Sequence, residues 1–178
     1  MANEILVKDG TPVVWADTTD YSDSDNFTRT HQIDLTSLAA TKARQGAKAD
    51  LGATRARQYA VKVAIEWGAA QVAGKAIEFY WSASHSDVAA TGNDAGASGS
   101  DAAWRDGTEA IWKKQAIYLG SLIANATGAG TVQRQTIGIF SPPMRYGQPI
   151  ALNMSAQALD SDATNMYIAL VPITDESQ

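Results

Sequence analysis

The 178-residue sequence contains no cysteine, and this absence excludes several kinds of site at once. Disulfide frameworks, thiolate zinc sites and cysteine nucleophiles all require that residue. Only two histidines occur, His31 and His85, and they stand far apart in the sequence. We therefore expect no metal site and no cofactor.

Long hydrophobic runs are missing as well. No apolar stretch approaches the 18 residues of a membrane-spanning helix. The first ten residues include Glu4 and Asp9 and lack the apolar segment of a secretory signal. The chain is therefore expected to have no contact with a membrane, and its length suits one domain.

The charge of the sequence is acidic and unevenly distributed. Fourteen basic and 19 acidic residues give a net charge of -5, which argues against a nucleic-acid partner. Residues 1–35 hold seven acidic and two basic groups, whereas residues 36–62 hold six basic groups and one acidic group. These segments either complement each other between subunits, or meet a partner of opposite charge, or are simply solvated faces.

Alternation of apolar and polar residues with a period of two dominates the rest of the chain. In residues 59–67, for example, the odd positions are Tyr, Val, Val, Ile and Trp, as in a half-buried strand. This pattern and the turn-rich stretches between segments predict an all-β fold, an eight-stranded antiparallel jelly-roll-like sandwich. The predicted strands are residues 31–35, 44–51, 59–67, 76–83, 115–123, 131–140, 148–155 and 166–174.

Two regions fall outside this pattern. Residues 1–29 contain short apolar runs and then a polar tract, and they are interpreted as an extended N-terminal arm beside a β domain of residues 30–178. Residues 84–107 are rich in Gly, Ser, Asp and Ala, and they are interpreted as a long irregular loop. Loops of this length without periodicity are usually functional or disordered.

Residues that could support catalysis form no convincing pattern. Asp20, Asp23 and Asp25 resemble a calcium loop in spacing, but the central glycine and closing glutamate of an EF-hand are absent. Residues 85–87 are His, Ser and Asp, the residue types of a hydrolase triad. Adjacent residues, however, cannot adopt triad geometry with one another. We therefore predict no catalytic residue and no enzymatic activity.

Apolar residues outside the periodic strands are the candidates for partner contact. Trp67 and Trp81 occupy core positions of predicted strands, but the other three tryptophans do not. Such aromatic residues are enriched at interfaces, although local loop packing explains them equally well. The candidate contact residues are Ile5, Leu6, Val7, Val13, Val14, Trp15, Trp104 and Trp112.

From about Asp34 onward, several segments occur in a characteristic order. The segments are Asp50-Leu-Gly-Ala-Thr-Arg55, Gly99-Ser-Asp-Ala-Ala103, Lys114-Gln-Ala-Ile-Tyr-Leu-Gly-Ser121, Pro142-Pro-Met-Arg-Tyr-Gly147 and Ile168-Ala-Leu-Val-Pro-Ile-Thr-Asp175. In this order the sequence resembles a family of small structural proteins of tailed bacteriophages. It is a similarity of pattern, and it carries no known chemistry.

The resemblance implies a virion protein, most often a capsid decoration (cement) protein that binds the outer surface of the major capsid protein lattice and stabilises the shell. It also implies production in the bacterial host cytoplasm and a location on the capsid surface. A homotrimer is implied as well, and it would cover exposed strand edges. The alternatives are a tail or baseplate component and a carbohydrate-binding jelly-roll module for host-surface recognition. Within the leading interpretation, the arm is expected to carry attachment while the body folds without it.

Overall fold

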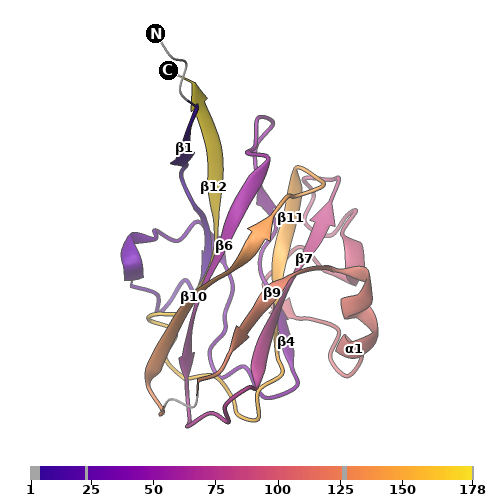
Figure 1. The fold of residues 1–178 in the computed structure, drawn as a ribbon. Coiled ribbons are helices and arrows are strands. Elements are labelled where there is room, and N and C mark those ends of the chain that lie inside the picture. The colour runs from indigo at the N-terminus through magenta and orange to yellow at the C-terminus, as the bar shows by residue number, and fades with distance from the viewer. Residues whose placement is uncertain (1–4, 23, 126–127, 178) are drawn as a thin grey trace.

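Two six-stranded β-sheets face each other in the computed structural model of the chain (Figure 1). The structure describes residues 5–22, 24–125 and 128–177, with the backbone alone at residues 5, 6, 24 and 175–177. The prediction of an all-β fold is confirmed. The described residues form twelve strands, however, and not eight.

Sheet A has the strand order β10-β6-β12-β2-β3, and β1 pairs with β12 beyond β2. All its pairs are antiparallel except β2 with β3, which is parallel. Its strands are β1 (Ile5–Asp9), β2 (Val13–Ala16), β3 (His31–Gln32), β6 (Gln58–Trp67), β10 (Thr131–Phe140) and β12 (Tyr167–Ser177).

Sheet B has the order β8-β4-β11-β7-β9, and β5 pairs with β11. Its strands are β4 (Ala43–Gln45), β5 (Ala49–Asp50), β7 (Ala76–Ser84), β8 (Ala102–Ala103), β9 (Ile117–Ile123) and β11 (Tyr146–Asn153). Helical turns are short: η1 (Ser24–Asn26), η2 (Asp94–Gly96), α1 (Glu109–Trp112) and η3 (Lys113–Gln115). Among the described residues, no helix has the length and apolar character needed to cross a membrane.

The main core lies between the sheets and is formed by the inward positions of the alternating strands. Along β6 every odd residue from Tyr59 to Trp67 is at most 2% exposed, as the period of two predicts. Trp81 lies near the middle of the core, with its ring edge-on to Trp15 at 5.7 Å and tilted against Phe140 at 5.4 Å. Large aromatic side chains thus fill the space between the sheets.

Gly147 is required where β11 passes this aromatic cluster. A Cβ atom at Gly147 would lie 2.4 Å from the Trp81 ring, so any side chain there would displace the tryptophan. The glycine therefore allows the backbone of β11 to approach an indole in the sandwich core.

The interpretation of residues 1–29 as an arm outside the body is wrong for β2. This strand lies inside sheet A between β12 and β3, and Trp15 is completely buried. The Trp15 indole N–H donates a hydrogen bond of 2.7 Å to the carbonyl oxygen of Ala47 in the body. Four residues are too few to display a period, so the boundary at residue 29 separates nothing in the fold.

The long segment of residues 84–107 is not a free loop. It lies over the outer face of sheet B, where Ala95, Ala97 and Trp104 pack with Tyr80 and Ile150 in a second buried cluster. The Trp104 indole N–H donates to the Ala95 carbonyl at 3.2 Å. Trp104 therefore helps to anchor a stretch whose composition indicates flexibility.

One end of the sandwich carries a projecting two-stranded ribbon, formed by β1 and the last residues of β12 (Figure 1). The pairing of β12 with β6 ends at Ile173, which lies opposite Gln58. Beyond Ile173, β12 pairs only with β1, in an antiparallel register that places Ile5 opposite Ser177. The two ends of the described chain therefore lie together at the tip of this ribbon.

Candidate functional site

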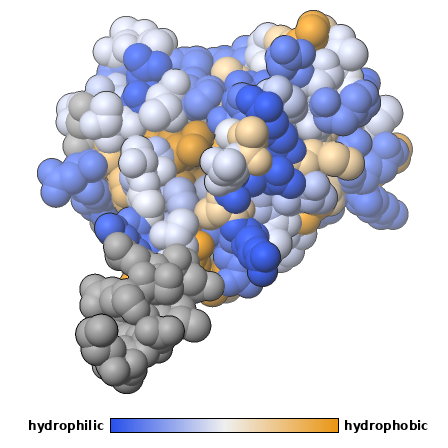
Figure 2. All heavy atoms as spheres, turned by 90° about the horizontal axis from the view of Figure 1, so that it is seen from above, coloured by the Kyte–Doolittle hydropathy of each residue, from blue (hydrophilic) through white to orange (hydrophobic). Residues whose placement is uncertain are grey.

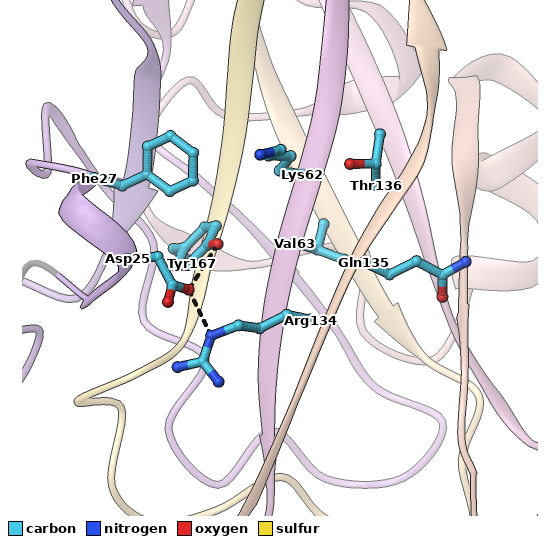
Figure 3. Close-up of a pocket in the computed structure, with 8 residues that line it drawn as sticks. All are labelled: Asp25, Phe27, Lys62, Val63, Arg134, Gln135, Thr136 and Tyr167. Carbon is cyan, nitrogen blue, oxygen red and sulfur yellow. Dashed lines mark hydrogen bonds and ion pairs between the residues drawn. The ribbon is translucent and has the colours of Figure 1, made fainter.

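A hollow of about 300 Å³ lies on the outer face of sheet A (Figure 3). Small residues at outward positions form the sheet beneath it, since Ala64 and Ala169 have no side chain that reaches into solvent. The hollow is lined by Asp25, Phe27, Lys62, Val63, Arg134, Gln135, Thr136 and Tyr167. It lies between the N-terminal segment, with Asp25 and Phe27, and the strands of sheet A.

Asp25 links three parts of the chain at this hollow. Its carboxylate oxygen Oδ2 accepts hydrogen bonds from Arg134 Nε at 2.5 Å and from the Tyr167 hydroxyl at 3.0 Å. The residue has a φ of 61°, a left-handed conformation that aspartate tolerates better than most residues. The ion pair therefore fixes η1 against β10 and β12.

Tyr167 forms the buried side of the hollow and is 3% exposed. Burial, followed by the hydrogen bond to the Asp25 carboxylate, raises the pKa of the Tyr167 hydroxyl well above its ordinary value. Phe27 packs edge-on against its ring at 5.1 Å, and Lys62 Nζ lies 5.6 Å from the centroid of the Phe27 ring. The phenol thus stays protonated and donates its hydrogen bond at any physiological pH.

The chemistry available in this hollow is that of a weak polar contact. The Asp25 carboxylate balances the charge of Arg134, so Lys62 supplies the remaining positive charge. The hydroxyl and carboxylate that meet in the lining, those of Tyr167 and Asp25, are engaged with each other and with Arg134, and Tyr167 is buried. These contacts hold the covering segment on the sheet, and the exposed Lys62 side chain gives the open part of the hollow a positive charge.

Carboxylates and histidines do not gather elsewhere in the described part of the chain. No group of three or more metal-binding side chains occurs there. Of the three aspartates with calcium-like spacing, Asp23 lies outside the described residues and Asp25 bonds to Arg134. The His85 ring lies close to Gly92, where an added Cβ would be 2.6 Å from the imidazole.

The predicted contact residues are dispersed by the fold, and several are internal. Val14, Trp15 and Trp104 are each at most 1% exposed within their own chain, so their assignment to a partner is wrong. These apolar side chains suggested an interface, but they are buried against the chain's own sheets. Val13 is half-buried and packs against the main core.

The remaining candidates lie nearer the surface. Val7, in the ribbon, is 72% exposed, whereas the side chains of Ile5 and Leu6 lie outside the described residues. Trp112 is half-buried, and the Arg105 guanidinium lies over its ring at 3.9 Å. Only Val7 among the described candidates presents most of its side chain to solvent.

Exposed apolar residues on the sheet edges were missed by sequence reasoning. Ile139 is 67% exposed, Tyr118 is 56% exposed and Ile123 is 56% exposed, on edge strands β10 and β9. Register shifts near Gly138 and Gly120 change the alternation there. The sequence contains no clear signal for Ile139, because its outward position depends on the register shift in the pairing of β10 with β6.

Comparison of the chain with protein-family models, curated proteins and solved structures finds no match.

Proposed function

We propose that this chain is a non-enzymatic structural protein of a tailed-phage virion. In this role it is a capsid decoration protein that binds the outer surface of the major capsid protein lattice as a homotrimer and stabilises the shell. The sequence resemblance to phage structural proteins suggests the class, and the arrangement of the strands supports it.

The eight principal strands support a jelly-roll description of the sandwich. Numbered along the chain, β2, β4, β6, β7, β9, β10, β11 and β12 become strands one to eight. Sheet A then has the order one-eight-three-six and sheet B has the order two-seven-four-five. Two interleaved Greek keys produce this order, and jelly rolls recur in viral capsid and lectin domains.

The observation that carries the proposal is the projecting ribbon of β1 and β12 on an otherwise self-contained sandwich. The chain's own segments cover both outer faces, with Phe27 over sheet A and Trp104 over sheet B. The ribbon adds nothing to the main core, because β12 leaves sheet A at Ile173. An element that extends away from a completed body is suited to contact with a neighbour in an assembly.

For the carbohydrate-binding alternative, the described residues offer one exposed aromatic side chain, Tyr118, and no exposed tryptophan. Sugar sites commonly use exposed aromatic faces, but Trp15, Trp67, Trp81 and Trp104 are at most 1% exposed. Trp112 is covered by Arg105. This distribution favours the structural role.

Purified protein should bind empty shells assembled from the major capsid protein encoded in the same genome. Co-sedimentation should saturate at a fixed ratio to the capsid protein, and decorated shells should withstand a higher temperature than bare shells. The matched control is a shell from an unrelated phage, which should remain undecorated. If the protein co-purifies only with tails, or binds cell-surface polysaccharide but no shell, the capsid assignment is wrong.

A further inference from the structure

The ribbon of β1 and β12 has unpaired backbone edges. From Thr174 to Ser177, β12 pairs with β1 on one side and with no described strand on the other. On its outer edge, β1 likewise pairs with no described strand. An open edge is a template for a further strand, which is the basis of β-augmentation.

An isolated two-stranded ribbon is marginally stable in water. From Ile173 to Ser177 it extends by about 14 Å at the usual rise of a strand. Val7 within it is 72% exposed. A ribbon of this kind gains stability when a second surface covers an edge and its apolar side chains.

A basic loop lies at the base of the ribbon. Residues 51–57 connect β5 to β6, and they contain Arg55 and Arg57 without an acidic residue. Within the described part of the chain, the Arg57 guanidinium makes no ion pair, and Arg55 makes one long hydrogen bond of 3.5 Å to the Pro143 carbonyl. These two cations are therefore available to a partner.

A hollow of about 450 Å³ adjoins the basic loop. It is lined by Arg57, Gln58, Ser141 and Ile173, so it lies where β12 leaves sheet A. Figure 2 views the molecule from this end, and hydrophilic residues dominate the surface around separate, small hydrophobic areas. A partner at this end is therefore expected to bind through charge and backbone pairing as well as through apolar contact.

The ribbon and the basic loop are complementary in charge. The ribbon contains Lys8 against Asp9, Asp175 and Glu176, a net charge of -2, whereas the loop carries +2. Both lie at the same end of each copy. A head-to-tail contact, in which the ribbon of one copy meets the loop of the next, forms a ring when its rotation closes. A second copy of this chain thus offers the surface that the ribbon lacks.

We propose that the β1–β12 ribbon of one copy lies across the basic loop and hollow of a second copy and so builds the homotrimer. This inference rests on the trimer of the proposed function and assigns its interface. The acidic ribbon contacts Arg55 and Arg57 of the neighbouring copy, and the open edge of the ribbon provides backbone hydrogen bonds. The contact is heterologous and closes after three copies.

The test compares oligomeric state by sedimentation velocity over a range of concentrations, using the chain alone. Removal of residues 174–178 leaves the pairing of β12 with β6 intact and should weaken association roughly tenfold or more. Charge reversal of the loop, R55E with R57E, should weaken it similarly, as should D175K with E176K in the ribbon. The four substitutions together should restore association, because the charges are exchanged and not lost.

The matched control is K75E with K114E, which makes the same change in charge at exposed lysines outside this end. It should leave association unchanged, and circular dichroism should confirm the fold of every variant.

If the truncated chain remains a trimer, the ribbon interface is wrong while the trimer stands. A full chain that is monomeric at every concentration overturns both, and the shell-binding assay still decides decoration. Ribbon amides that become protected from hydrogen exchange only on added shells would assign the ribbon to the capsid instead.

Discussion

At the scale of single residues, Lys48 shows how one side chain can organise a long segment. Its ammonium group donates to the Ser84 hydroxyl at 2.9 Å and to the carbonyls of Ser86, Val88 and Thr91 at 3.0, 2.7 and 2.9 Å. Burial lowers the pKa of this ammonium group. The lysine thus takes the place that a bound cation often has in loops of converging carbonyls.

The substitution K48M should lower the free energy of unfolding by about 2 kcal/mol, since the oxygen acceptors lose a charged donor. Urea denaturation measures this loss, and hydrogen exchange should accelerate in residues 86–91. The control is K75M, at an exposed lysine in the turn before β7, which should change stability little. Equal losses in the two variants would contradict the role assigned to Lys48.

His31 is expected to make the free energy of unfolding depend on pH near neutrality. Burial, followed by the positive charge of Arg29, lowers the pKa of His31 below its ordinary value of 6.5. Its ring lies 5.4 Å from that of Trp15. The folded state therefore prefers the neutral imidazole, and the unfolded state binds more protons as the pH falls through 6.5.

The free energy of unfolding should consequently decrease as the pH is lowered from 7.5 to about 5. In H31Q this part of the decrease should disappear, whereas H85Q, at an exposed position, should retain it. Denaturant titrations at the two pH values measure the difference. An unchanged pH dependence in H31Q would show that the effect has another source.

At the scale of elements, the longest strands were the most predictable. The alternation in β6 and β12 was readable because each crosses the sandwich and buries one face in the core. The predicted strand of residues 44–51 is two short strands, β4 and β5, because the chain leaves sheet B between Gln45 and Ala49. Local periodicity cannot display such an interruption.

Short strands and covering segments were not predictable in the same way. β2 has only four residues. Its place between β12 and β3 depends on pairing with β12, which lies more than 100 residues away in the sequence. Residues 84–107 lack any period, so only Trp104 hinted that they pack on a sheet. Composition predicts that these apolar side chains will be buried, but it does not predict which surface they will pack against.

Deletion of residues 1–29 should abolish cooperative unfolding, contrary to the expectation of an independent arm. The deletion removes β2 and Trp15 from the core, and loss of one buried tryptophan typically costs about 3–5 kcal/mol. A typical domain has only about 5–15 kcal/mol in total. Deletion of residues 1–10, which removes β1 alone, should preserve the β spectrum and the thermal transition. A folded 30–178 fragment would restore the arm interpretation.

At the scale of the whole molecule, the basic band predicted in residues 36–62 is partly used inside the chain. Arg44 forms two hydrogen bonds of 2.7 Å with Asp101, and Lys42 pairs with Asp106. Lys48 is directed into the covering segment. The band therefore does not face a partner as a unit, and Arg55 and Arg57 are its members at the ribbon end.

The candidate contact residues were predictable only as a class, namely apolar residues outside the periodic strands. Exposed Val7 follows from an apolar run too short to form a core, but Trp15 satisfies the same description and is internal. The difference arises from the tertiary pairing of β2, which no local pattern contains. Charge distribution did not resolve the difference either, because Arg44, Lys42 and Lys48 of the basic band are engaged within the fold.

The antiparallel pairing of β1 with β12 has a mechanical consequence. Since Ile5 lies opposite Ser177, a force that separates the two ends of the chain loads the ribbon at its tip. The backbone hydrogen bonds then open one after another, each with a net strength of about 1 kcal/mol, and do not resist together as they would under shear. Tension applied through the termini should thus unzip the ribbon gently as far as Ile173, where β6 takes up the load and the sandwich begins to resist.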